Sequence, residues 1–137
     1  MNITEIKLDV MELISRLSHA MDGTDPETYA DLFTGDGTYI SRINHEDIVH
    51  GGSKKEIVDY ALELFAARGD DQPRHHIRNT IFLTISETDV STATYFLATN
   101  VSGKGRLAVV TGTGIYEDKI VLTENGWRIH KRIAVYD

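Results

Sequence analysis

The chain has 137 residues, is 41% hydrophobic and carries 14 basic and 21 acidic side chains, which give a formal net charge of -7. This length is sufficient for one domain with its own hydrophobic core, and the negative charge argues against a nucleic-acid-binding surface. The absence of cysteine excludes disulfide bonds and thiolate metal sites. No apolar run approaches the roughly 18 residues of a membrane-spanning helix, and the acidic, amphipathic N-terminus is unlike a secretion signal. We therefore expect a single cytoplasmic domain over residues 1–137 that binds neither nucleic acid nor membranes.

Two helices are expected at the beginning of the chain. Residues 2–21 repeat apolar side chains at helical spacing, which predicts one amphipathic helix. Asn2 and Glu5 resemble a capping pair at its start, and Gly23 suits a left-handed helix end. A second, short helix is expected within residues 25–33.

The next segment is expected to contain a strand, a loop and a third helix. Residues 38–43 are predicted to form the strand, and the polar stretch after it, up to Gly52, the loop. Ser53 and Glu56 form a second capping signature that opens the helix. The apolar side chains of this helix at helical spacing are Ile57, Tyr60, Ala61, Leu64 and Phe65.

The chain changes to alternating patterns after Pro73. Strands are expected at 74–86, 89–101, 106–118, 119–123 and 127–135. Asn125-Gly126 is a hairpin signal between the last two of them. Helices followed by a run of antiparallel strands predict an α+β fold, in which helices partly cover a curved, mostly antiparallel sheet.

Two adjacent histidines, His75 and His76, lie in the first of these strands. Successive strand residues point to opposite faces, so at most one of the pair faces the core. The buried face is predicted to carry His75, Ile77, Asn79, Ile81, Leu83 and Ile85. A buried imidazole needs a hydrogen-bond partner. His75 is therefore either a core histidine bonded to the backbone or an acid or base that lines a pocket.

Asp22 ends the first predicted helix, where the helix dipole disfavours a negative charge. It is either a solvated turn residue or a carboxylate that points inward at an imidazole. In the second case it would fix the tautomer of His75 and stabilise the imidazolium that forms when the ring takes a proton.

Other candidate features are weaker. The glycines of "GKGRLA", residues 103–108, precede a strand instead of opening a helix, so they do not predict a dinucleotide site. His45 and His50 flank the polar loop and are expected to be exposed, and no metal-ligand spacing occurs. We expect no cofactor and no metal. Side chains expected in the core or at a pocket mouth are Met21, Phe33, Tyr60, Phe65 and Leu97.

Three stretches resemble the SnoaL-like family of the nuclear transport factor 2-like superfamily. They are "AMDGTDPETYADLFTGDGTYI", "RHHIRNTIF" and "GIYEDKIVLTENGWRIHKRIAV". The resemblance covers nearly the whole chain. It implies the cystatin-like fold, in which N-terminal helices and the curved sheet form a cone with a pocket. It also implies a homodimer through the outer face of the sheet.

Within this superfamily the motifs are similar to those of scytalone dehydratase and hexachlorocyclohexane dehydrochlorinase. Both enzymes eliminate a small group with a histidine base that an aspartate supports. The resemblance places Asp22 on that aspartate and His75 on the base. It places Arg132 on the arginine of the dehydrochlorinase and Tyr39 on an aromatic pocket residue.

Some positions depart from these parallels. Leu17 stands where the dehydrochlorinase has a lysine. The second histidine of scytalone dehydratase has no counterpart, and Tyr95 is the nearest polar candidate. By alternation Arg132 lies on the face opposite Trp127. Either a bulge near Lys131 turns it inward, or the last strand is covered on both sides, or Arg132 is a solvated strand residue.

Two functions remain open at this stage. One is a cofactor-free lyase or isomerase for a small, mostly apolar, cyclic substrate, in which His75 takes a proton and Asp22 orients it. The side chains expected to hold the developing negative charge are Asn79, Tyr39, Tyr95 or Arg132. The other is a non-catalytic ligand-binding or assembly module of the same fold. A pocket below about 300 Å³ would argue against a drug-sized substrate.

Overall fold

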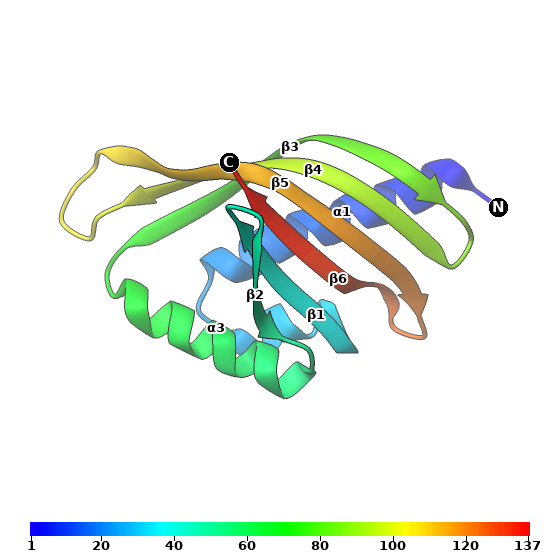
Figure 1. Cartoon of the computed structure of the whole chain (residues 1–137), viewed down its shortest axis with the longest axis horizontal. Coiled ribbons are helices and arrows are strands. Elements are labelled where there is room, and N and C mark those ends of the chain that lie inside the picture. Colours follow the sequence, from blue (N-terminus) through cyan, green and yellow to red (C-terminus); the bar gives the residue numbers. More distant parts are fainter.

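The computed structural model describes residues 1–137 as a six-stranded sheet partly wrapped by three helices (Figure 1). The sheet has the order β2-β1-β6-β5-β4-β3, and all neighbouring strands are antiparallel except β1 and β6, which are parallel. In chain order the elements are α1 (Ile3–Asp22), α2 (Pro26–Ala30), β1 (Phe33–Ile43), β2 (Glu46–Gly51), α3 (Lys54–Arg68), β3 (Gln72–Ile85), β4 (Asp89–Val101), β5 (Ala108–Thr123) and β6 (Gly126–Tyr136). The predicted α+β class is confirmed.

Both predicted capping signatures are present. The side chain of Asn2 accepts a hydrogen bond from the N–H of Glu5 at 3.1 Å, and Ser53 accepts one from Glu56 at 3.2 Å. The predicted left-handed end of α1 is wrong, because Gly23 has φ -86° and ψ -156°. The chain instead leaves α1 in an extended conformation, and α2 begins three residues after Gly23, at Pro26. None of the three helices is long and apolar enough to cross a membrane.

The segment predicted as a loop up to Gly52 contains strand β2, so that prediction is wrong. A tight turn joins β1 to β2, and both Asn44 and His45 at this turn have positive φ values, 52° and 66°. Such turns match the twist of a hairpin, but Asn-His lacks the glycine that usually signals them. His45 is exposed as predicted, whereas His50 lies on β2 and is half-buried.

Strand β3 changes faces at a bulge. Arg78 pairs with Tyr95 but Ile81 pairs with Ala93, so β3 has one extra residue there. Asn79 lies in this bulge with a φ of 57°. The predicted inward face therefore holds for His75 and Ile77 but is wrong for Asn79, Ile81 and Leu83, which are exposed. A further register shift between Phe82 and Thr84 returns Ile85 to the core side, as predicted.

A second bulge lies on β6. Lys119 of β5 pairs with Lys131 and Ile120 pairs with Ile129, so His130 has no partner. This extra residue turns Arg132 to the inner face, which is the bulge alternative left open by the sequence. The predicted strands 106–118 and 119–123 are one strand, β5, and the Asn125-Gly126 hairpin is confirmed, with φ 95° at Gly126.

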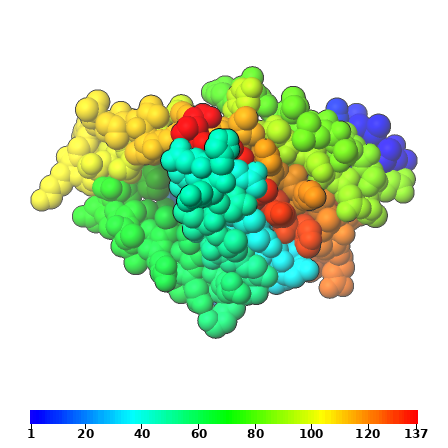
Figure 2. Space-filling model, in the orientation of Figure 1, coloured from blue at the N-terminus to red at the C-terminus, as the bar shows by residue number.

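The core lies between the inner face of the sheet and the helices. Helix α1 packs on β3 and β6, and α3 packs on β1, β2 and α2. The buried apolar side chains of α1 are Val10, Leu13, Ile14, Leu17 and Met21. Each fully buried aliphatic side chain contributes roughly 1.5–3 kcal/mol by leaving water. Figure 2 shows the β1–β2 hairpin lying across this view of the molecule, between α3 and the C-terminal strand.

Candidate active site

Asp22 and His75 lie in contact where the end of α1 meets the beginning of β3. The carboxylate Oδ1 accepts a hydrogen bond from Nδ1 of the imidazole at 2.5 Å, and Oδ2 accepts one from the backbone N–H of His75 at 2.8 Å. The Asp22 side chain is 7% exposed and that of His75 is 19% exposed. Because a carboxylate can only accept, a proton lies on Nδ1, and in the neutral imidazole Nε2 then carries the free lone pair.

His76 points the other way. It is exposed, and its Nε2 lies 3.1 Å from Oγ1 of Thr99 on β4. Of the two adjacent histidines, only His75 can therefore reach the interior. His76, on the opposite face of β3, is therefore a matched control for substitutions of His75.

His75 lines a cavity of about 270 Å³. The other lining residues are spread over most of the chain and are Met21, Tyr39, Tyr60, Leu64, Arg68, Asp71, Pro73, Asn100, Thr111 and Tyr136. Pockets for drug-sized ligands begin at about 300 Å³. The cavity therefore suits a molecule smaller than a typical drug.

Three predicted pocket residues do line this cavity, namely Met21, Tyr39 and Tyr60. Burial raises the pKa of Tyr60 to about 12 and raises the pKa of Tyr39 well above its ordinary value. Both phenols are therefore neutral around pH 7 and can donate a hydrogen bond to an oxygen in the cavity.

Three other predicted pocket residues lie on the outside. Tyr95 and Leu97 are 55% and 38% exposed, because the inward-facing positions of β4 are the alternate ones, such as Phe96. Asn79 is exposed at the bulge of β3. The expectation that Asn79, Tyr95 and Leu97 share a pocket with His75 is therefore wrong, since none of them lines this cavity.

Phe33 is buried but does not line the cavity. Its ring packs edge-on against Tyr29 at 5.5 Å and Tyr39 at 6.4 Å between ring centroids. Phe33 therefore belongs to the core and packs against Tyr39, which lines the cavity.

Arg132 is fully buried and forms a two-point ion pair with Asp118. Nε and Nη2 each donate to a carboxylate oxygen at 2.8 Å, and the guanidinium lies 3.8 Å from the ring centre of Tyr116. Burial alone would lower the pKa of Arg132, but the Asp118 carboxylate outweighs it and the net pKa is raised. Arg132 is thus inside the cone but does not line the cavity. Asp118, which lies directly opposite Arg132 in the β5–β6 register, was missed from the sequence.

Polar residues at the cavity rim were also missed. Nη1 of Arg68 donates to the carbonyl of Met21 at 3.0 Å, and its guanidinium lies 4.5 Å from the ring centre of Phe65. Asn100 donates to the carboxylate of Asp71 at 3.1 Å. These residues come from a helix end, a loop and a strand end, and no local pattern shows that they meet.

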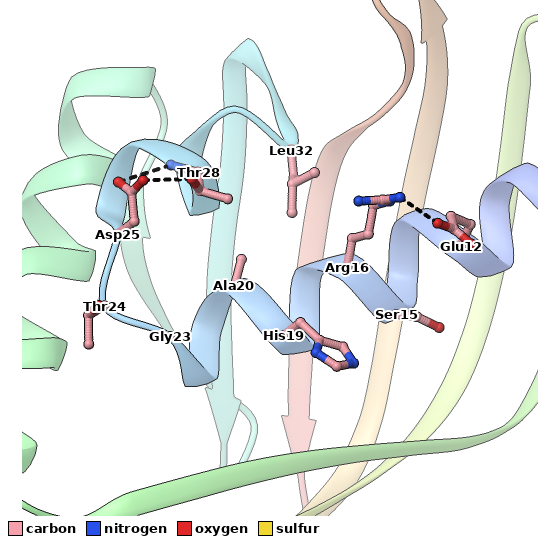
Figure 3. Close-up of a pocket in the computed structure, with 10 residues that line it drawn as sticks. All are labelled: Glu12, Ser15, Arg16, His19, Ala20, Gly23, Thr24, Asp25, Thr28 and Leu32. Carbon is pink, nitrogen blue, oxygen red and sulfur yellow. Dashed lines mark hydrogen bonds and ion pairs between the residues drawn. The ribbon is translucent and has the colours of Figure 1, made fainter.

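A larger groove of about 620 Å³ runs along α1 and α2 on the outside of the molecule. Figure 3 shows that its charged side chains are largely occupied with one another: Arg16 pairs with Glu12 at 2.7 Å, and Asp25 accepts from Thr28. His19 also lines the groove, but no hydrogen bond orients its ring. The larger volume therefore does not identify the site, because His75, which Asp22 orients, lines the smaller cavity.

A family model described as a SnoaL-like domain matches residues 3–133. No curated protein matches the chain. Three solved structures are similar to it over nearly its whole length. Their sequence identities are only 21–23%, so they show that the fold is shared and nothing more.

ActVI-ORFA from Streptomyces coelicolor is 21% identical with a TM-score of 0.81, and the match covers 96% of this chain and 98% of that one. A protein from Catenulispora acidiphila in complex with S-DNPA is 23% identical with a TM-score of 0.80, covering 98% and 95%. A candidate scytalone dehydratase from Novosphingobium aromaticivorans is 21% identical with a TM-score of 0.76, covering 99% and 86%.

Proposed function

The chain belongs to the SnoaL-like domain family, and from this membership and the Asp22–His75 contact we propose that it is a cofactor-independent acid–base lyase or isomerase. Its substrate is a small, mostly apolar, cyclic compound. The size of the cavity, about 270 Å³, supports a substrate with few rings. Structural relatives that include a candidate scytalone dehydratase and a protein crystallised with a small molecule are consistent with this class of ligand.

In this proposal His75 is the base. Its Nε2 removes a proton from a carbon beside a carbonyl group, and the electron pair moves toward the carbonyl oxygen. The proton then returns to another carbon in an isomerisation, or to the departing oxygen in a dehydration. General acid–base catalysis of this kind contributes roughly 10²–10⁴-fold, so positioning in the cavity supplies the remainder.

Asp22 orients the base and stabilises its charged form. The hydrogen bond to Nδ1 directs the lone pair of Nε2 away from the carboxylate. The hydroxyl groups of Tyr39 and Tyr60 are the cavity donors suited to the oxygen on which negative charge develops. Arg132 acts indirectly in this scheme, through Asp118 and Tyr116, because it does not line the cavity.

The single observation that carries the proposal is the two-point contact of Asp22 with His75 beside a cavity. Proton abstraction can be tested without knowing the natural substrate. Cyclic ketones such as cyclohexanone, 2-cyclohexenone and 1-tetralone are incubated with the protein in heavy water, and deuterium uptake beside the carbonyl is followed by NMR.

We expect His75→Ala to lower the catalysed exchange by about 10²-fold or more, whereas His76→Ala serves as the matched control on the opposite face and retains it. Exchange by the wild type that is equal to that of His75→Ala would refute the assignment of His75 as base.

A non-catalytic ligand-binding module is the second candidate, because a cavity below about 300 Å³ argues against a drug-sized substrate. Asp22 and His75 would then be a structural polar link. In that case His75→Phe would preserve the fold and the affinity for a cavity ligand, and no exchange would be found with any ketone.

The proposal includes a cytoplasmic homodimer that forms through the outer face of the sheet. The exposed side chains of Tyr95 and Leu97 on that face support it. Sedimentation velocity of the wild type and of Tyr95→Glu tests it, and a monomeric wild type at micromolar concentration would refute it.

A further inference from the structure

Three rings, those of Tyr39, His50 and Tyr60, form a closed cluster beside the cavity. The centroid distances are 5.2 Å between Tyr39 and His50, 4.4 Å between His50 and Tyr60, and 5.6 Å between the two tyrosines. Since all three distances are similar, the rings form a triangle and each one contacts the other two. Their planes differ by only 25–35°.

A bulge places His50 in this cluster. Tyr39 pairs with Gly51 and Ile40 pairs with Val49, so His50 is an extra residue on β2 without a ladder partner. Its Nε2 lies 2.7 Å from the hydroxyl oxygen of Ser41, which is buried on β1. The imidazole is therefore half-buried and held at one edge by a hydrogen bond, although its strand lies at the edge of the sheet.

The two tyrosines of the cluster are cavity residues, whereas His50 is not among those that line it. Tyr39 comes from β1 and Tyr60 comes from α3, so no backbone ladder fixes one ring relative to the other. The imidazole contacts both from the side of β2. Without this ring, the space beside both phenol rings would be open, and they could tilt or shift.

We propose that His50 is a positioning residue, whose imidazole fixes the tilt and separation of the Tyr39 and Tyr60 rings and so sets the shape of the aromatic wall of the cavity. It acts through these two rings and does not touch the substrate. The inference rests on the proposed function in so far as this cavity is the substrate site, but the ring geometry can be measured without catalysis.

The experiment uses 2-naphthol, a flat and fluorescent ring compound, as a probe of the cavity. Its dissociation constant is measured by fluorescence titration for the wild type, His50→Ala and His50→Phe. We expect about tenfold weaker binding for His50→Ala and a value within about threefold of the wild type for His50→Phe, because the phenyl ring restores the contacts. His45→Ala, at the exposed turn of the same hairpin, is the matched control and should bind as the wild type does.

His50→Gln separates ring contact from hydrogen bonding, because it can still bond to Ser41 but has no ring. It should bind as weakly as His50→Ala, and it decides the question if the alanine variant does not fold. In the wild type, NOEs from the imidazole protons to both tyrosine rings are expected, and the Tyr60 ring resonances should move in His50→Gln and return toward their original positions in His50→Phe.

Equal binding by His50→Gln and the wild type, or equally weak binding by His50→Gln and His50→Phe, would overturn the inference. Failure of the wild type to bind 2-naphthol would also overturn it, since the cluster would then not present a ring-binding wall. Failure of the proposed function has a different signature, namely no deuterium exchange by the wild type together with normal, His50-dependent binding of 2-naphthol.

Discussion

The carboxylate of Asp22 accepts both the backbone N–H and the ring Nδ1–H of a single residue, His75. The backbone contact fixes the position of the carboxylate relative to β3, and the ring contact fixes the imidazole relative to that carboxylate. One carboxylate oxygen is held by the backbone and the other holds the ring, so Asp22 alone fixes the orientation of the imidazole. This arrangement also offsets the unfavourable location of a negative charge at the end of α1.

Asp22→Asn should change the tautomer of His75. An asparagine has one acceptor oxygen and one NH₂ donor in place of two acceptor oxygens, so it cannot accept from both the backbone and Nδ1. We expect the ring proton to leave Nδ1 in a large fraction of molecules, which long-range ¹H–¹⁵N spectra detect directly. Catalysed exchange should fall by roughly 10²–10⁴-fold, since the wrong nitrogen then carries the lone pair. An unchanged tautomer would contradict the role assigned to Asp22.

Breaking the Arg132–Asp118 pair should strongly destabilise the fold. Asp118→Asn or Arg132→Met leaves one buried group without its partner, which costs about 3–5 kcal/mol. Urea unfolding monitored by circular dichroism measures the loss.

Arg42 and Asp47 form the same two-point contact on the surface, at 2.7 and 3.1 Å, and provide the matched control. Arg42→Met should lower the free energy of unfolding far less than the buried substitutions do, because exposed pairs are screened by water. If Arg42→Met and Arg132→Met lowered the free energy of unfolding equally, Asp118 and Arg132 would have to be hydrated in the folded protein.

Much of the fold could be predicted because its signals are local. Helix periodicity, the capping pair Asn2–Glu5 and the hairpin at Asn125-Gly126 involve residues close together in the chain. The bulge at Asn79 could not be predicted and the one at His130 was one of the open alternatives for Arg132, since a bulge is defined by the register with a partner strand. Each one reverses the alternation of the residues that follow it, and on β3 the reversal lasts until a second register shift between Phe82 and Thr84.

The same reason separates the predicted from the missed parts of the site. His75 precedes the bulge of β3, so alternation placed it correctly, whereas Asn79 lies in the bulge and was placed on the wrong face. His50 was expected to be exposed because it flanks a polar stretch. The bulge in β2 that turns it inward cannot be recognised from the local sequence. Arg68 and Asn100 reach the cavity rim only through tertiary packing.

The buried tyrosines should make the protein sensitive to alkali. Burial raises the pKa of Tyr60 to about 12 and also raises those of Tyr29, Tyr39 and Tyr116, whereas an unfolded tyrosine ionises near about 10. Between about pH 10 and 12 the folded state therefore holds protons that the unfolded chain loses, and stability falls as the pH rises.

Tyr60→Phe should make this decline shallower, by up to about 1.4 kcal/mol per pH unit. Urea unfolding at pH 9, 10 and 11 gives the slope for both proteins. Identical slopes would mean that the Tyr60 phenol ionises as readily in the folded protein as in the unfolded chain.

His50 should contribute an acid-sensitive part of the stability. Burial lowers its pKa below the ordinary value of about 6.5, so the unfolded chain binds a proton that the folded state takes up less readily. Its contribution is complete above about pH 6.5 and is lost as the pH falls toward the lowered pKa. The stability of the wild type should therefore fall more between pH 7.5 and 5.5 than that of His50→Phe. A parallel decline of the two proteins would contradict the burial of this imidazole.

The left-handed backbone at Asn79 predicts opposite effects for two substitutions at one exposed position. Asn79→Val should cost about 1–2 kcal/mol, because a β-branched side chain is strained at a φ of 57°. Asn79→Gly should be neutral or slightly stabilising, since glycine adopts this conformation without strain and the side chain makes no hydrogen bond that would be lost. Arg78→Val, on the neighbouring exposed residue outside the bulge, should change stability by less than about 0.5 kcal/mol. Because the bulge reverses the alternation of β3, a well-tolerated Asn79→Val would imply that the strand is regular there and that Ile81 and Leu83 face the core after all.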